Sequence, residues 1–325
     1  MKRLLHTELT RLRWRRAVLV LMLLALALPL LLLAGEAWNT RPISEADLAQ
    51  AQVEIDAMNA ENERYIAECL DDPESYGIDP ERAEQECEGM YAAPTPEEWL
   101  FRPTLDLASV REGAGLALVT ILALVAGVVG TTFVGHDWAS GSMSNQLLFE
   151  PRRARVWLAK ALAVVLGTVV VAAVSILLFW AGAALVAQVR DIETSADTWS
   201  QILATQARGL VLIGSVGLGG YALTTLLRST VASLGVLFGA VVVSSMLLAI
   251  LLGVNAERWL LPTNVFAFVL GGYDYYTGNE VSCDADGNCT GMSRLHTGQA
   301  AIYLACLVVP TVVASLWSFR RRDVP

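Results

Sequence analysis

Residues 136–160 read HDWASGSMSNQLLFEPRRARVWLAK and form the longest polar, basic interruption between two apolar segments of the chain. The flanking segments, residues 113–135 and 156–187, are long enough to cross a hydrocarbon core of about 30 Å at about 1.5 Å per residue. Arginine-rich loops between such segments stay on the cytoplasmic side of a membrane. The stretch therefore predicts a cytoplasmic loop, residues 136–155, between two membrane spans.

The loop itself predicts a short helix. Ser140 or Ser142 is placed to cap its start, because serine hydroxyls accept hydrogen bonds from the first free N–H groups of a helix. Glu150 is placed to end it, because the residue before a proline avoids the helical region. Pro151 then suits the first turn of the next helix, which continues into the membrane.

The predicted helix, residues 140–149, would carry Met143, Leu147 and Leu148 as an apolar stripe with polar residues on its other side. Such a helix could transmit a push from a partner protein. It could equally be a linker whose arginines reach into lipid head groups. The residues alone leave both interpretations open.

The order of residue types in this loop resembles the loop between the second and third spans of ATP-binding-cassette (ABC) type-2 transporter permeases. The family pattern runs acidic residue, Gly-Thr, Leu-Leu, Pro, Arg and Lys. Asp137 stands where the family usually has Glu, and Ser142 where it usually has Thr. The residues that the resemblance assigns to coupling with an ATPase are Asp137, Gly141, Ser142, Leu147, Leu148, Glu150, Pro151, Arg152, Arg153 and Lys160.

The resemblance implies a half-transporter. Two copies of the chain, or the chain and a related permease, would form the pathway, and two copies of a separate ABC ATPase would bind ATP and Mg and drive it. This chain would carry no cofactor and would not be an enzyme. Asp137 and Glu150 would meet basic residues of the ATPase, while Arg152, Arg153 and Arg155 would hold the loop at the membrane surface.

The apolar runs predict an all-α integral membrane protein with six spans. Hydrophobic residues make up 54% of the chain and charged residues only 17%, below the share of about 25% in soluble domains. The expected order is a cytoplasmic interfacial helix (1–16), spans at 17–34, 113–135, 156–187, 209–227, 231–254 and 299–319, an acidic helical outer insert (35–112), outer loops (188–208 and 255–298), and a cytoplasmic tail (320–325).

The distribution of charge predicts the orientation. With residues 1–16 inside, the cytoplasmic segments hold 14 of the 23 basic residues and 4 of the 32 acidic ones. The inside then sums to +10 and the outside to −19, which gives the formal charge of −9. Because lysine and arginine concentrate on the cytoplasmic side, both termini are expected there, and the acidity of the chain makes nucleic acid an unlikely partner.

The outer segments contain four cysteines. Cys69 pairs most simply with Cys87, and Cys283 with Cys289, although four cysteines allow three pairings. Disulfides fit the oxidising side of a membrane. Within the insert, Ser44 is placed to cap a long helix, and the insert could gate release, bind an outer partner or serve as a structural cap. An apolar piece at residues 260–270 is too short to cross and predicts short or re-entrant helices.

Several classes of function are disfavoured. The centres of the expected spans hold no Asp, Glu, Lys, Arg or His, whereas ion-driven transporters use such groups. The chain lacks GxxxxGK[ST], so any ATP must be bound by another subunit. His6, His136 and His296 are scattered, which predicts no metal site. Glycine-rich second and fourth spans predict close helix packing.

The expected function is export of a hydrophobic or amphipathic substrate, such as a lipid, a drug or an antibiotic-like molecule, because an uncharged tunnel suits such cargo. A different class remains open. The chain could be a membrane scaffold or sensor whose acidic outer insert binds a partner, with no solute moving.

Overall fold

The structure, a computed structural model, describes residues 1–277, 282–283 and 289–322. The chain divides into two compact units. The larger, Met1–Ala34 with Asp106–Pro325, is a bundle of long helices. The smaller, Gly35–Leu105, is named the acidic unit here.

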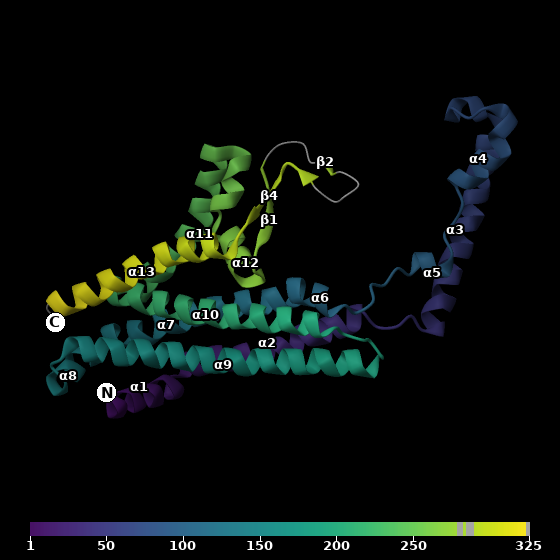
Figure 1. The fold of residues 1–325 in the computed structure, drawn as a ribbon. Coiled ribbons are helices and arrows are strands. Elements are labelled where there is room, and N and C mark those ends of the chain that lie inside the picture. The colour runs from purple at the N-terminus through teal and green to yellow at the C-terminus, as the bar shows by residue number, and fades with distance from the viewer. Residues whose placement is uncertain (278–281, 284–288, 323–325) are drawn as a thin grey trace. The chain divides into compact units, whose positions relative to one another are not determined.

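Six helices among the described residues are long and apolar enough to cross a membrane. They are α2 (Arg16–Asn39), the continuous segment of α6 (Leu107–Val110), the π-helical turn η3 (Arg111–Gly115) and α7 (Leu116–Ala139), then α9 (Arg153–Val189), α10 (Ala196–Leu227), α11 (Thr230–Leu252) and α13 (Thr297–Arg321). Figure 1 shows most of them as long parallel and antiparallel rods. The chain is an all-α multi-pass membrane protein, which confirms the predicted fold class and number of spans.

Helix α10 is longer than the span expected at residues 209–227. It begins at Ala196, because the hydroxyl of Ser195 accepts a hydrogen bond from the N–H of Thr198 at 3.1 Å and caps the first turn. Most of the segment expected as an outer loop, residues 188–208, is therefore helical.

Glycines bring α7 and α10 together. A Cβ atom on Gly130 would lie 2.3 Å from the carbonyl oxygen of Gly217, and one on Gly220 would lie 2.5 Å from the carbonyl oxygen of Gly127. Both obstacles are backbone atoms, so neither position accepts a side chain unless a helix moves. The predicted packing role of these glycine-rich spans is confirmed.

Two short helices, α1 (Lys2–Trp14) and α8 (Ser142–Phe149), lie at the end of the bundle where α13 ends (Figure 1). One buried apolar cluster joins them to the long helices. It contains Leu12 of α1, Met143 of α8, Trp157 of α9 and Phe319 of α13. This cluster fixes α8 against the bundle and positions the polar site described below.

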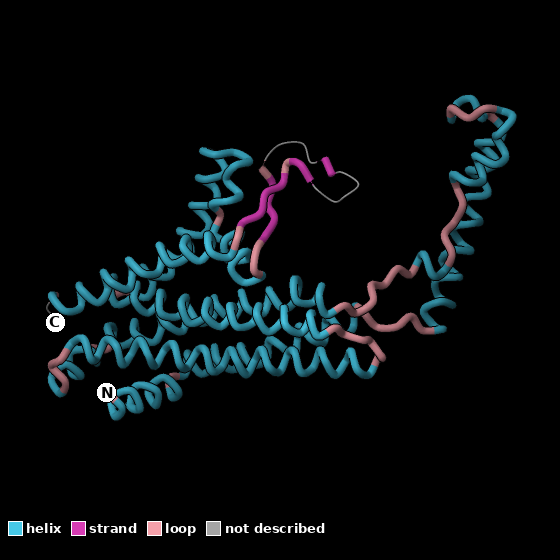
Figure 2. The backbone as a smooth tube through the Cα atoms, in the orientation of Figure 1, coloured by secondary structure: helices cyan, strands magenta, loops and turns pink. Residues whose placement is uncertain are grey.

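The segment between α11 and α13 contains strands that the sequence did not predict. After η4 (Gly253–Trp259) and α12 (Leu261–Leu270), β1 (Tyr273–Tyr276) pairs antiparallel with β4 (Met292–Leu295), and β2 (Ser282–Cys283) pairs with β3 (Cys289–Thr290) (Figure 2). Strands this short show no alternation that sequence inspection could detect. Tyr275 and Leu295 bury their side chains against Ala267 and Ala300, which holds the hairpin to α12 and α13.

The acidic unit is helical. It contains α3 (Glu45–Asp71), η1 (Pro73–Tyr76), η2 (Pro80–Arg82), α4 (Ala83–Met90) and α5 (Pro96–Trp99). Ser44 caps α3 as predicted: its hydroxyl accepts the N–H of Asp47 at 3.2 Å, and the Asp47 carboxylate accepts the N–H of Ser44 at 3.0 Å.

A disulfide joins α3 to α4. Cys69 and Cys87 are bonded, with their Cα atoms 5.9 Å apart, and both are fully buried beside Ile78 and Ala83. The predicted first pairing is confirmed. Cys283 and Cys289 face each other in the backbone register of β2 and β3, but their side chains lie outside the described part of the chain, so the second disulfide stays a prediction.

Candidate functional site

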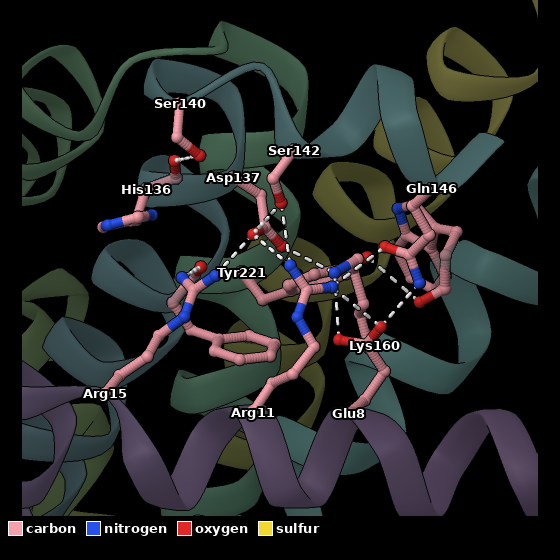
Figure 3. A network of polar contacts seen from close by, with 12 residues as sticks. Glu8, Arg11, Arg15, His136, Asp137, Ser140, Ser142, Gln146, Lys160 and Tyr221 are labelled. Carbon is pink, nitrogen blue, oxygen red and sulfur yellow. Dashed lines mark hydrogen bonds and ion pairs between the residues drawn. The ribbon is translucent and has the colours of Figure 1, made fainter. Parts of the chain in front are cut away.

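A network of charged side chains lies where α1, α7, α8 and α9 meet (Figure 3). It is named the Lys160 network here. Its members are Glu8 and Arg11 of α1, Arg15 just after α1, Asp137 of α7, Ser142 and Gln146 of α8, and Lys160 of α9. The network links the first helix of the chain to the loop helix 130 residues later through direct polar contacts.

Asp137 is the acceptor at the centre of the network. Its Oδ1 atom accepts hydrogen bonds from Arg11 Nη2 at 3.0 Å and from Ser142 Oγ at 2.8 Å, and it also pairs with Arg15. Its Oδ2 atom pairs with Lys160 Nζ. The side chain is fully buried. Both oxygens of a buried carboxylate are thus matched by cationic or hydroxyl donors, as burial of an ion requires.

Lys160 joins the two acids of the network. Its Nζ atom contacts Asp137 and also donates to Glu8 Oε2 at 2.9 Å, and all three side chains have no exposed surface. The ring of Phe133 lies against the same group, with its centroid 5.4 Å from Nζ. Lys160 and both acids are therefore buried together, with the ammonium group between the acids, while Arg11 and Arg15 are partly exposed.

The contacts between α1 and α8 run through Arg11 and Gln146. Arg11 donates to Ser142 Oγ at 2.7 Å and to Gln146 Oε1 at 3.3 Å, while Gln146 Nε2 donates to Glu8. Two polar side chains of α8, Ser142 and Gln146, are therefore bonded directly to α1 (Figure 3). A movement of α8 must either carry α1 with it or break these bonds.

Helix α8 begins differently from the prediction. Neither serine caps it: Ser140 donates to the carbonyl oxygen of His136 at 2.8 Å, and Ser142 donates to Asp137. Gly141 occupies the N-cap position with φ +68°. This left-handed conformation is favourable for glycine and costly for other residues, so Gly141 sets the sharp turn between α7 and α8.

The apolar stripe predicted for α8 is wrong in one residue. Met143 is buried and Leu147 packs on the apolar cluster, but Leu148 is 80% exposed. Phe149, the last residue of the helix, is 90% exposed. Met143 and Leu147 therefore anchor α8 to the bundle, whereas Leu148 and Phe149 form an exposed apolar tip.

The remaining predicted residues lie around this tip. Glu150 ends α8 with an extended backbone (φ −128°), as the following Pro151 requires. Pro151 itself lies before α9, which starts at Arg153 rather than at the proline. Arg152 is exposed, and Arg153 donates to the carbonyl oxygen of Arg322.

Burial changes the role expected for Asp137. A carboxylate with no exposed surface and four partners inside the chain does not meet basic residues of another subunit in this structure. Glu150 is partly exposed beside the tip and keeps that expected role. Asp137 instead fixes the position of α8 from within.

Comparison with known protein families decides the class. Residues 3–324 match the family described as ABC-2 family transporter protein, which is essentially the whole chain. The chain belongs to the ABC-2 transporter family. No curated protein and no solved structure matches it. As an ABC-2 transporter protein it is a membrane permease subunit of an ABC transporter. Such subunits are generally non-catalytic, and the family implies an ABC ATPase as partner.

Sequence inspection missed four members of the network in this ABC-2 protein. Glu8, Arg11 and Arg15 lie in the expected interfacial helix, where charges normally face lipid head groups or water, and Gln146 carries no charge. One signal was available: Glu8 is the only acid among the first 35 residues. An isolated acid in a basic helix marks a position that needs a buried cation.

The described residues contain no group of three or more His, Cys, Asp or Glu that could hold a metal ion. The contacts within the Lys160 network are ion pairs and hydrogen bonds between helices. What the network can do is hold α8, α1, the end of α7 and the start of α9 in one arrangement.

Proposed function

We propose that the chain is the permease subunit of an ABC exporter in which α8 receives the movement of a separate ATPase. The exposed tip, Leu148 and Phe149, carries this proposal. Large apolar side chains that are 80% and 90% exposed at the end of an anchored helix suit insertion into a pocket of a partner. Glu150 beside them supplies a charge that a basic residue of the partner can meet.

The movement would pass from α8 into the spans through two rigid connections. Gly141 joins α8 to α7, and the segment from Glu150 to Arg152 joins it to α9. The Lys160 network adds a third connection, to α1. Force applied to the tip would therefore act on the second and third spans together, rather than bend a free loop.

In this proposal two such permease chains form the pathway, with two ATPase copies below them and ATP and Mg bound on the ATPase. Helices α11 and α13 expose apolar side chains, including Ile250, Leu251, Ile302 and Val313, which suit contact with lipid or a second copy. The transported molecule would be hydrophobic or amphipathic, because the described spans offer apolar side chains at their centres.

The test is purification of the tagged chain in mild detergent, followed by identification of bound proteins. The wild type should retain an ATP-binding protein, and Leu148→Ser/Phe149→Ser should lose most of it while eluting as a folded protein. Leu177→Ser is the matched control, because Leu177 is also an exposed apolar residue but lies in the middle of α9. Retention of the ATPase by the tip variant would overturn the proposal and favour a scaffold or sensor.

A further inference from the structure

The bundle contains an open cleft of about 790 Å³ at the start of α7, whereas α8 follows the end of that helix. It is named the α7–α12 cleft here. Its walls come from η3 and the first turns of α7 on one side, and from α12 and the β1–β4 hairpin on the other. These elements belong to the same compact unit. The cleft shares no lining residue with the Lys160 network.

One wall of the cleft is apolar. Leu116, Ala117 and Ile121 lie along two turns of α7, and Phe266 and Leu270 face them from α12. The α7 residues belong to the span expected at residues 113–135 and lie near its first residues. A wall of this kind, running from the end of a span into its body, suits the apolar part of an amphiphile.

The rim of the cleft is charged. Two arginines and two acids line it: Arg111 pairs with Glu112, and Arg294 Nη1 lies 3.5 Å from Asp274 Oδ2. The Nε atom of Arg111 is buried and has no acceptor among the described residues. Both acids are more than half exposed, so water screens both pairs and an anion can compete for the guanidinium groups.

A third arginine adds a charge that no acid balances. The guanidinium group of Arg208 lies against Gly271, where a Cβ atom would be 2.3 Å from Nη1, and Arg294 lies against the next residue, Gly272. Arg208 donates from Nε to the carbonyl oxygen of Ala204 at 3.0 Å, and no carboxylate pairs with it within the described residues. Arg208 is not a lining residue of the cleft, but it lies beside Arg294 at this turn. The cleft and the turn together therefore hold three guanidinium groups and two carboxylates.

From the excess of guanidinium groups over carboxylates at the cleft and its adjoining turn, together with the apolar wall, we infer that the α7–α12 cleft binds an amphiphile with an anionic head group, a phosphate or a carboxylate. Guanidinium groups match both anions through paired N–H donors, and the wall of α7 would take the apolar chain. The site stands on its own as a binding site. Its use as a stage of transport rests on the proposed function.

The test is direct binding to the purified, delipidated chain in a zwitterionic detergent. The probes are fluorescent phosphatidylglycerol, fluorescent phosphatidylcholine and, as competitors, dodecyl phosphate and inorganic phosphate. The wild type should prefer the anionic lipid by about tenfold or more, which corresponds to about 1.4 kcal/mol. Arg208→Gln should remove most of that preference. Equal binding of both lipids would overturn the inference.

Two further variants separate the site from general charge and from misfolding. Arg258→Gln removes an exposed arginine of η4 outside the cleft and should keep the preference. Ile121→Trp fills the space beside the apolar wall without changing the charge, and it should weaken the binding of both lipids. The inference would be overturned if Arg258→Gln lost as much of the preference for the anionic lipid as Arg208→Gln, or if Ile121→Trp bound both lipids as the wild type does. Arg208→Gln should still bind the ATPase, so failure here is distinct from failure of the proposed function.

The competitors identify the source of the anion. Displacement by dodecyl phosphate, but not by inorganic phosphate at the same concentration, would support a site for amphiphiles. Displacement by inorganic phosphate at equal strength would show that the apolar wall adds nothing and would overturn the proposal as stated.

Discussion

Lys160 is the residue on which the charged site at α8 depends. Arg11 and Lys160 each pair with both Asp137 and Glu8, but only the side chain of Lys160 is fully buried between them, whereas that of Arg11 is 31% exposed. Two carboxylates buried together repel each other unless a cation stands between them. The resemblance pattern singled out Lys160 and Asp137 for coupling to an ATPase. Their contact with Glu8 was not predictable, because nothing in the sequence says which face of α1 turns toward the bundle.

Lys160→Met should destabilise the chain strongly. Methionine keeps an apolar side chain of similar length but leaves two buried carboxylates without their ammonium partner, and breaking such a pair costs about 3–5 kcal/mol. Thermal unfolding in detergent should show a midpoint several degrees lower. Arg155→Met is the matched control, since Arg155 is an exposed base in the first turn of the same helix and should change the midpoint little.

A double-mutant cycle tests whether Glu8 and Lys160 act together. Glu8→Gln in the Lys160→Met background removes an acid that has lost its ammonium partner, so the pair of substitutions should cost less than the sum of the single ones. Strict additivity would contradict the proposed coupling between α1 and α9.

Asp47 makes the stability of the acidic unit depend on pH. Arg102 donates to it at 2.8 and 3.0 Å, and Ser44 donates from its N–H at 3.0 Å and its hydroxyl at 2.8 Å. These bonds, first those from Arg102, hold the pKa of Asp47 well below its usual range. Because the unfolded pKa is about 3.9, the stabilisation is complete above about pH 4 and is lost as the pH falls toward the folded pKa.

Asp47→Asn should therefore speed hydrogen exchange in the first turns of α3 at neutral pH, and the difference from wild type should shrink at about pH 3. Asp56→Asn, at an exposed position on the same helix, should change exchange little at either pH. A difference at about pH 3 as large as at neutral pH would contradict the assignment.

At the scale of elements, the helix pair α7 and α10 is the part of the bundle that sequence reasoning predicted best. Five glycines in each expected span predicted close packing, and backbone contacts at Gly130 and Gly220 confirm it. The start of α10 at Ala196 was not part of that prediction, because the polar residues after Ser195 resemble a loop although they form a capped helical extension. Polar helix ends outside the hydrocarbon core carry no hydropathy signal.

Gly130→Ala should separate α7 from α10. Its methyl group would lie 2.3 Å from the carbonyl oxygen of Gly217, a distance that only backbone movement can relieve. The unfolding midpoint should fall by several degrees. Gly219→Ala is the matched control, because no atom lies within 4 Å of its Cβ position and alanine favours a helix by about 1 kcal/mol. Equal effects of both substitutions would contradict the close approach of the two helices.

At the scale of the whole molecule, the chain is organised around two polar sites on an apolar bundle: the Lys160 network beside α8 and the α7–α12 cleft. Hydropathy and the loop pattern predicted the number of spans and the family. They could not predict the cleft, because Arg111, Arg208 and Arg294 are far apart in sequence. Arg208 and Arg294 come together at the turn formed by Gly271 and Gly272, and Arg111 reaches the same cleft from η3. Contacts of this kind depend on how helices pack, which composition does not encode.

The orientation inferred from charge gives a labelling prediction. In a Cys306→Ser parent, Val53→Cys in the acidic unit should react with a membrane-impermeant maleimide on intact cells, and Phe149→Cys at the tip should react only after lysis. Both positions are exposed, so accessibility of the side chain does not limit either. The Cys306→Ser parent, labelled in parallel, gives the background reaction of the other cysteines. Labelling of Phe149→Cys on intact cells would show that the orientation is opposite to the one proposed.

The most direct test of the central claim is photo-crosslinking in cells from a light-activated amino acid placed at position 149, with position 143 as the buried control. The account predicts that position 149 captures a protein carrying GxxxxGK[ST], that position 143 does not, and that the adduct is lost in Leu148→Ser. Capture of lipid alone from position 149, or equal capture of the ATPase from both positions, would contradict the claim that α8 receives the movement of an ATPase.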